Sequence, residues 1–107
     1  MELSQYQVVL VNLDPTIGSE VKKTRPCVIL SPDEMNKFLR TVIIAPITGT
    51  SKKYPTRIEI KGKNTNGWIM IDQIRTVDRR RITRIFGSLS ENEVLEVKKV
   101  IQEAFID

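Results

Sequence analysis

The sequence of 107 residues contains no histidine and only one cysteine, Cys27. Without histidine there is no Ser-His-Asp or Cys-His nucleophile system and no imidazole general base. One cysteine forms no internal disulfide, and the missing Cys/His cluster excludes a structural zinc site. Because Cys27 stands in an apolar run that ends at Leu30, we expect it to be a small core residue and not a reactive thiol.

Aromatic residues and long apolar runs are also scarce. Aromatic side chains make up 6% of the chain, so a core built from its 40% apolar residues should consist largely of Val, Ile and Leu. No apolar run reaches membrane-spanning length, and the first residues lack the basic and apolar regions of a signal peptide. We therefore expect one domain over residues 1–107, cytoplasmic and without membrane contact.

What the sequence does have is positive charge, with a formal net charge of +4. This balance favours a polyanionic partner such as RNA or DNA, although it is also ordinary for a soluble basic protein. The charge gathers in short runs that could follow an RNA strand or could simply be solvated loops: Lys22-Lys23, Lys52-Lys53 and Arg79-Arg80-Arg81. Thr50 and Ser51 stand beside one run and could bond phosphates.

Several short segments have strand character and are separated by Gly, Pro and Asn. The expected strands are residues 6–13, 27–30, 41–48, 57–60, 68–71 and 74–77, with an Asn/Gly turn over residues 63–67. The apolar run of residues 27–30 predicts burial on both faces, or on one face of a strongly curved sheet. Pro46 removes a ladder donor, which indicates an edge or a bulge there. Trp68 is expected in the core or at an oligomer interface, with base stacking as the alternative.

Two capping boxes predict helix starts. Ser31 with Glu34 begins a short helix that should end near residue 39 or 40, and Ser90 with Glu93 begins a second helix. The second helix shows one apolar face to the end of the chain: Val94, Val97, Ile101, Ala104 and Phe105. These elements together predict a mainly β fold, a small barrel or strongly curved antiparallel sheet with helical additions.

Polar residues at the ends of apolar strands are the candidate functional residues. Arg25 begins one strand, Thr48 ends another, and Asp72-Gln73 interrupts a third. Each alone could be a turn former, but strand-end residues of a small barrel tend to gather at one rim. If that rim holds RNA, the Arg25 guanidinium matches two phosphate oxygens, and the Thr48 hydroxyl can donate to a phosphate oxygen. The base remains open between Glu20 and Asp72, whose pKa values burial would have to raise.

The ordered motifs resemble one family, the MazF/PemK (Kid) toxins of toxin-antitoxin modules. They are Gly18-Ser19-Glu20, Thr24-Arg25-Pro26, Pro46-Ile47-Thr48, Asp72-Gln73 and Arg75-Thr76. The resemblance implies an SH3-like barrel with a C-terminal helix, a homodimer, and an endoribonuclease that needs no metal or other cofactor. It also implies sequence-selective cleavage of single-stranded mRNA to 2',3'-cyclic phosphate and 5'-hydroxyl ends. The implied partner is a cognate antitoxin, through which alone operator DNA would be contacted.

The resemblance also implies residue roles. Arg25 and Thr48 match the catalytic pair, and Glu20 an acidic residue needed in some members. Asp72 matches a carboxylate proposed as a base in the PemK branch, but Met70 replaces the arginine that this branch has two residues earlier. That departure, with the missing histidine, favours the Arg25/Thr48 mechanism. The expected RNA-binding residues are Ser19, Lys22, Lys23, Thr50, Ser51, Lys52, Asp72, Gln73 and Arg79.

Two other functions compete with this hypothesis. Gyrase-poisoning toxins resembling CcdB share the barrel, but they end in an aromatic tail, whereas residues 104–107 here continue an expected helix. The other alternative is an RNA-binding barrel that never cuts. An assay on RNA in the presence of a chelator separates all three.

Overall fold

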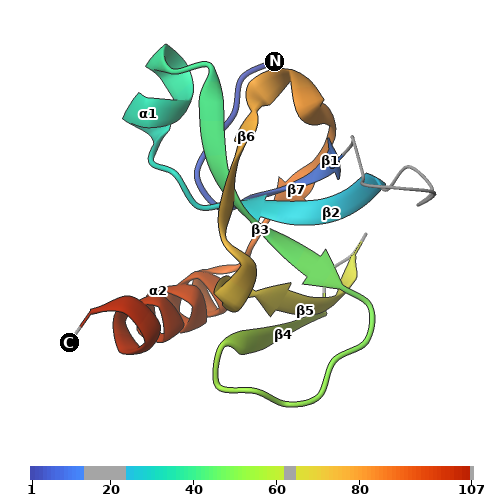
Figure 1. Ribbon diagram of the computed structural model, residues 1–107, viewed down its shortest axis with the longest axis vertical. Helices are drawn as coiled ribbons and strands as arrows, with labels where there is room; N and C mark the ends of the chain where they lie inside the picture. Colours follow the sequence, from blue (N-terminus) through green and yellow to red (C-terminus); the bar gives the residue numbers. More distant parts are fainter. Residues whose placement is uncertain (14–23, 62–64, 107) are drawn as a thin grey trace, which may run out of the picture.

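An antiparallel sheet and a C-terminal helix dominate the computed structural model, which describes residues 1–13, 24–61 and 65–106 (Figure 1). The strands are β1 (Gln7–Asn12), β2 (Thr24–Ile29), β3 (Thr41–Thr48), β4 (Arg57–Lys61), β5 (Asn66–Met70), β6 (Arg75–Asp78) and β7 (Ile82–Ser88). The helices are α1 (Asp33–Phe38) and α2 (Glu91–Phe105), and the 3₁₀ turns are η1 (Ile71–Gln73) and η2 (Arg79–Arg81). No helix in these ranges is long and apolar enough to cross a membrane.

The strand order confirms the mainly β prediction. Strands pair in the order β4-β5-β3-β2-β1-β7, with β6 added to β3, and every pairing is antiparallel. The pairings of the described residues do not join β4 to β7, so a closed barrel is not formed by these ladders. The predicted barrel is thus found as a strongly curved sheet.

Strands β1, β2 and β3 form a central layer with a hydrophobic core on each face. Val8, Val28 and Ala45 are registered side by side and belong to one core, which α2 covers. Cys27 and Ile29 belong to the other core, which β6 and β7 help to close. Because successive residues of a strand point to opposite faces, the buried part of β2, residues 27–29, is apolar continuously, in agreement with the predicted apolar run.

Pro46 lies where β3 changes partners. Residues 41–44 of β3 pair with β6, and residues 47–48 pair with β5. Between them, Ala45 and Pro46 pair only on the β2 side, with Val28 and Cys27. The proline therefore stands at an interruption of the ladder, where a missing N–H is tolerated, and not on an outer edge strand.

The start of α1 differs from the predicted capping box. Its N-cap is Pro32, without a side-chain cap, because Ser31 is buried and its hydroxyl is used elsewhere. Ser31 Oγ donates to Asn36 Oδ1 and accepts from the Ile43 amide at 3.1 Å. The tertiary contact with β3 has taken the hydroxyl that local sequence assigned to the helix.

The C-terminal helix starts as predicted, but its apolar face is buried over a shorter length than expected. Ser90 and Glu93 form the reciprocal capping box. Val97 and Val100 are buried where α2 packs against β4 and η1, whereas Ala104 and Phe105 are exposed. The expected face is wrong at its end because the last turn of α2 extends past the sheet (Figure 1).

Two further differences concern strands. β7 was not predicted, although it pairs with β1 along its length. β5 begins at Asn66, so the last residues of the expected turn belong to this strand. Trp68 is half-buried there, opposite Thr48 of β3.

Candidate active site

Arg25 and Thr48 line one open pocket of about 470 Å³ at the end of the central layer. The other lining residues are Thr24, Pro26, Ile47, Gly49 and Asn66. The pocket therefore contains a guanidinium, a hydroxyl and an amide side chain around one hollow. These are the groups that suit a phosphodiester and a nucleobase edge.

The sheet register explains why two residues so far apart in sequence meet. The β2–β3 ladder pairs Cys27 with Pro46. Extending that register by two residues brings Arg25 level with Thr48 at the open end of the ladder. Arg25 is the second residue of β2 and lies opposite Val11 of β1, so it stands near the start of the strand. Its backbone is thus fixed by a neighbouring strand as well as by Pro26.

The two side chains of this pair differ in their present partners. The hydrogen bonds and ion pairs formed among residues 1–13, 24–61 and 65–106 do not include the Arg25 guanidinium. Thr48 Oγ1 donates to the carbonyl oxygen of Thr50 at 3.0 Å. Arg25 is half-buried and lines the pocket from a strand that is paired on its β1 side. Among the described residues, therefore, no ion pair of Arg25 has to break before an oxyanion binds.

Cys27 next to the pocket has no reactive character. Its side chain is fully buried, and burial raises the pKa of the thiol to about 12. The charges of Arg25 and Arg75 act in the opposite direction but are outweighed. The prediction that Cys27 is a core residue is confirmed.

The Asp72 carboxylate is held in an ion pair with Arg57, which opposes its accepting a proton. The hydrogen bond from Arg57 is the largest cause that lowers the pKa of this carboxyl below its usual range. Arg57 Nε and Nη2 donate to the two Asp72 oxygens at 3.0 and 3.1 Å. A general base near neutral pH needs a raised pKa, so the geometry opposes the Asp72-base alternative.

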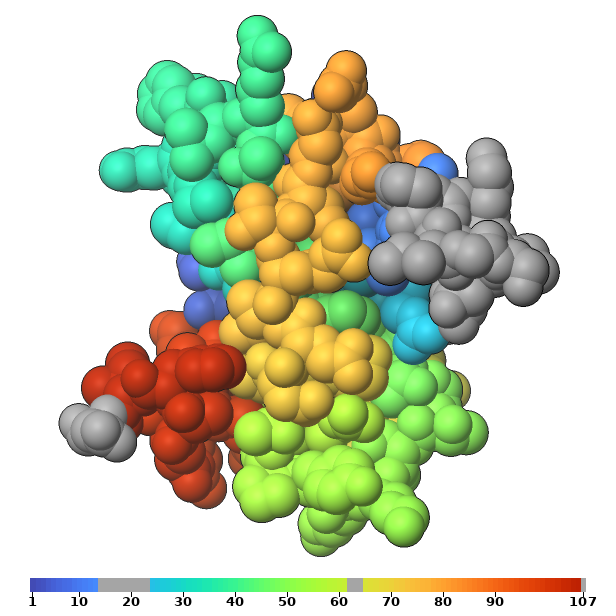
Figure 2. Space-filling model, viewed as in Figure 1, coloured from blue at the N-terminus to red at the C-terminus, as the bar shows by residue number. Residues whose placement is uncertain are grey.

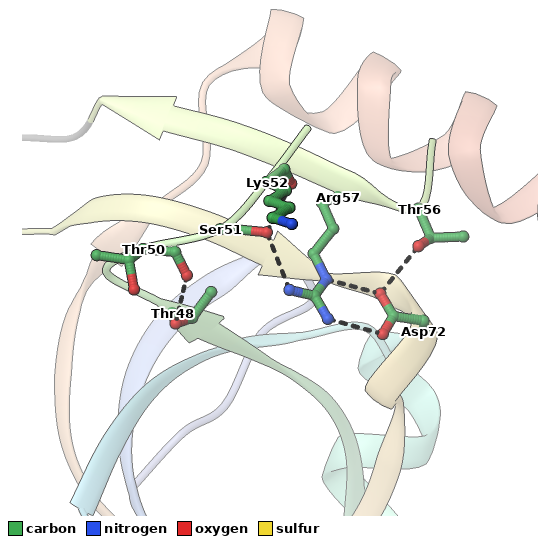
Figure 3. Close-up of polar contacts among 7 residues, drawn as sticks. All are labelled: Thr48, Thr50, Ser51, Lys52, Thr56, Arg57 and Asp72. Carbon is green, nitrogen blue, oxygen red and sulfur yellow. Dashed lines mark hydrogen bonds and ion pairs between the residues drawn. The ribbon is translucent and has the colours of Figure 1, made fainter. Parts of the chain in front are cut away.

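A second group of predicted residues lies on the segments next to this ion pair, and Ser51 contacts Arg57 directly (Figure 3). Thr50, Ser51 and Lys52 lie in the loop 49–56 that connects β3 with β4, and Gln73 lies beside Asp72 in η1. Lys52 and Gln73 are exposed. The structure thus brings the loop residues and η1 together, on the surface that continues from Thr48.

Arg79 lies elsewhere. Its Nη1 donates to the carbonyl oxygens of Asn36 and Leu39 at 2.6 and 3.1 Å, and Nη2 to that of Met1 at 3.3 Å. These contacts join η2 to the end of α1 and to the N-terminus, at the far end of β6 from the pocket (Figure 1). We therefore leave Arg79 out of the site, because carbonyl groups already occupy its donors.

The remaining predicted residues are Ser19, Glu20, Lys22 and Lys23. They lie outside the described residues, so their roles stay predictions. Within the described ranges, no group of three or more Cys, Asp or Glu side chains is arranged to hold a metal ion.

Sequence reasoning missed Asn66 and Arg57. Asn66 was assigned to a turn, and Arg57 was read only as part of an alternating strand. An arginine directly before the alternating apolar residues of a strand, with Thr56 beside it, was the available signal for Arg57. Its partner Asp72 is too far away in the chain for any local pattern to identify.

The curved sheet with its C-terminal helix places the chain in a known class, the type II toxins of toxin-antitoxin systems. Residues 4–105 match the family described as "PemK-like, MazF-like toxin of type II toxin-antitoxin system". Endoribonuclease MazF of Staphylococcus epidermidis is 40% identical over 100 residues, covering 88% of this chain and 83% of the relative. The chain belongs to the MazF endoribonuclease family.

Solved structures show the same fold. MazF of Deinococcus radiodurans matches with a TM-score of 0.82 and 23% identity over 96% of each chain. A MazE-MazF structure from the same organism gives a TM-score of 0.84 and 23% identity over 96% of this chain and 95% of that chain. A mycobacterial endoribonuclease in complex with its cognate antitoxin gives a TM-score of 0.81 and 17% identity over 95% of this chain and 93% of that chain.

Proposed function

We propose that this chain is a toxin endoribonuclease that cuts single-stranded mRNA in a sequence-selective manner and is neutralised by a cognate antitoxin. The observation that carries the proposal is the pocket in which Arg25 and Thr48 come together. Family membership supports the activity, and the crystallised MazE-MazF pair supports the kind of partner. The fold relatives support the overall framework alone.

The proposed reaction is an internal transesterification. The ribose 2'-oxygen attacks phosphorus and loses its proton, the bond from phosphorus to the 5'-oxygen breaks, and the leaving oxygen takes up a proton. Arg25 holds two non-bridging oxygens and stabilises the charge that develops on them, while Thr48 turns its hydroxyl from Thr50 to a phosphate oxygen. The products are a 2',3'-cyclic phosphate and a 5'-hydroxyl, with no metal step.

We assign the role of general base, which removes the ribose 2'-proton, to Glu20. Of the two carboxylates expected near the site, Asp72 is paired with Arg57 and has a lowered pKa. Glu20 precedes Arg25 by only a few residues of chain and is the remaining carboxylate. Active toxin is proposed to be a homodimer, and Ser19, Lys22, Lys23, Thr50, Ser51, Lys52 and Gln73 to contact the RNA strand.

The decisive experiment compares Arg25→Ala and Arg25→Lys with wild type on a mixed RNA transcript, with and without chelator. Loss of one preorganised charge contact to the transition state predicts a fall in kcat of about 100-fold or more for Arg25→Ala. Arg25→Lys should recover only part of it, because an ammonium lacks the planar fork. New 5'-hydroxyl ends are counted in each sample.

Arg40→Ala is the matched control, since Arg40 is exposed before β3 and away from the pocket. It should cut at the wild-type rate. Full activity of Arg25→Ala in a folded protein would refute the assignment. Wild-type protein that binds RNA without producing new ends would instead identify a non-cutting RNA-binding protein.

A further inference from the structure

Arg57 and Asp72 form a bidentate ion pair, and each of them makes a further hydrogen bond to a third residue. Asp72 Oδ1 accepts from Arg57 Nε at 3.0 Å and from Thr56 Oγ1 at 2.9 Å, and Oδ2 accepts from Arg57 Nη2 at 3.1 Å. The remaining terminal nitrogen, Nη1, donates to Ser51 Oγ at 2.9 Å. The two side chains therefore join η1 to both ends of the loop 49–56 (Figure 3).

Backbone and ring contacts strengthen the same junction. The Ile71 amide donates to the Thr56 carbonyl, and the Arg57 amide donates to the Tyr54 carbonyl, both at 3.0 Å. The Arg57 guanidinium also lies over the Tyr54 ring, 5.3 Å from its centre. In the space-filling view the surface of η1 adjoins that of the loop on one face (Figure 2). We call this junction the Arg57–Asp72 clamp.

An isolated surface ion pair usually contributes little, but the clamp differs from one in two respects. Its geometry is bidentate, and each partner makes a further side-chain hydrogen bond. The Arg57 side chain is only 16% exposed, against 87% for Arg80 in the comparable Arg80–Asp78 pair. The Asp72 side chain is 35% exposed, close to the 32% of Asp78, so the shielding from water is on the arginine side of the clamp.

The loop that the clamp holds carries three of the residues proposed to bind RNA, Thr50, Ser51 and Lys52. Without the clamp these residues would sample many conformations, and RNA binding would have to order them at an entropic cost. Thr48 is different, because its backbone is paired with Trp68 in the sheet. Loss of the clamp should therefore weaken substrate binding more than it slows the chemical step.

We propose that Arg57 and Asp72 are positioning residues that preorganise the loop 49–56 for a single-stranded RNA ligand. This inference rests on the proposed function, since the ligand is the substrate named there. It gives Asp72 a role in activity without proton transfer. It also explains why a carboxylate stands in a surface that binds a polyanion, since Asp72 is neutralised by Arg57.

The test uses Asp72→Asn, Arg57→Lys and the double variant in the full-length protein. KM is measured on an RNA oligonucleotide that carries a mapped cleavage site. Each single variant should raise KM about tenfold, within the range that a ~1 Å misplacement produces, and change kcat less than threefold. The double variant should be no worse than either single one, because both remove the same contact.

The direction in which KM changes separates a positioning role of Asp72 from an effect of its charge on RNA binding. Asp72→Asn makes the surface more positive, so electrostatics alone would lower KM. Asp78→Asn is the matched control, since Asp78 is held by Arg80 in the same bidentate manner but outside the site. It should leave both constants unchanged.

Other outcomes overturn the inference in distinguishable ways. A wild-type KM for Asp72→Asn shows that the clamp does not matter, and a fall in kcat with loss of the acidic limb of the pH profile shows that Asp72 is a base. If wild type cuts no RNA, the proposed function fails, and anisotropy of a fluorescent mixed-sequence RNA then tests the clamp through binding alone. Thermal melts identify any variant that has lost its fold. If Asp72→Asn does not fold, Arg57→Lys, which keeps the positive charge, tests the clamp in its place.

Discussion

At the scale of the single residue, Cys27 shows how a position beside the pocket is kept chemically inert. It lies two residues after Arg25 on β2 with its thiol in the core that β6 and β7 help to close, and burial raises the pKa of the thiol to about 12. A neutral thiol is a poor nucleophile and is protected from oxidation. The site can therefore depend on a buried cysteine for packing without a redox liability.

This burial predicts slow labelling and a loss of stability at high pH. The folded pKa, about 12, lies above the unfolded value of 9.0, so the unfolded thiol ionises first. The contribution of Cys27 to the free energy of unfolding is thus complete below pH 9.0 and falls as the pH rises toward 12. Iodoacetamide at pH 8 should label the protein only in urea.

Cys27→Ala removes the ionisable group and serves as the control. The stability of this variant should not show the decrease above pH 9.0 that the thiol causes. At neutral pH it should be less stable than wild type by roughly 1 kcal/mol, because a small cavity opens. Rapid labelling of the native protein would contradict the burial.

At the scale of the element, β5 approaches β3 closely beside Thr48, the threonine proposed to bind the phosphate. A Cβ atom added at Gly67 would lie 2.5 Å from the Thr48 carbonyl oxygen and 2.9 Å from Ile47 Cγ2. Both neighbours belong to β3, and the first is backbone, which cannot move aside cheaply. Only glycine permits this approach.

Gly67→Ala should therefore act on stability and activity together. Overpacking of this kind costs about 1–3 kcal/mol, and the displaced Thr48 should lower kcat. Urea melts and RNA cleavage measure the two effects. Gly49→Ala tests the steric argument, since its Cβ would meet nothing within 4 Å, and its stability should change by no more than ~0.5 kcal/mol. Equal melting of both variants would count against the argument.

The elements also show what the sequence could and could not predict. Ser90 and Glu93 form their capping box because both partners lie within one turn, and that information is local. Ser31 carries the same signal, but the fold buries it against Asn36 and β3, which no local pattern encodes. Propensity correctly placed a helix here and failed only on the use of the hydroxyl.

The missed strand β7 has a different explanation. Its pairing with β1 shifts register between Val8 and Val9 and again between Leu10 and Val11. Each shift breaks the alternation of inward and outward residues on which strand recognition depends. The site is similar: strand-end positions indicated Arg25 and Thr48, whereas the partnership of Arg57 with Asp72 arises only when distant segments pack.

At the scale of the whole molecule, the net charge of +4 predicts that substrate affinity falls with salt. Binding to a single strand releases counterions with a slope of about 0.7 per neutralised phosphate. If Arg25 and Lys52 each contact one phosphate, log KM should rise with log salt with a slope of at least ~1.4. KM measured over a potassium chloride series gives this slope.

Lys52→Gln should reduce that slope by about 0.7. Lys98→Gln is the control, because Lys98 is likewise an exposed lysine followed by a second lysine but lies on α2. An unchanged slope for Lys52→Gln would remove Lys52 from the RNA path, while an equal reduction for Lys98→Gln would attribute the effect to net charge.

The layer of β1, β2 and β3 lies between two cores and supplies residues to both. Neither core is a separate unit, since melting one exposes the back of the strands that line the other. A chain of this size thus has no partly unfolded form in which one core survives intact, and unfolding should be all-or-none. Arg25 and Thr48 stand on this shared layer, so a molecule in which either core has melted no longer holds the two side chains together.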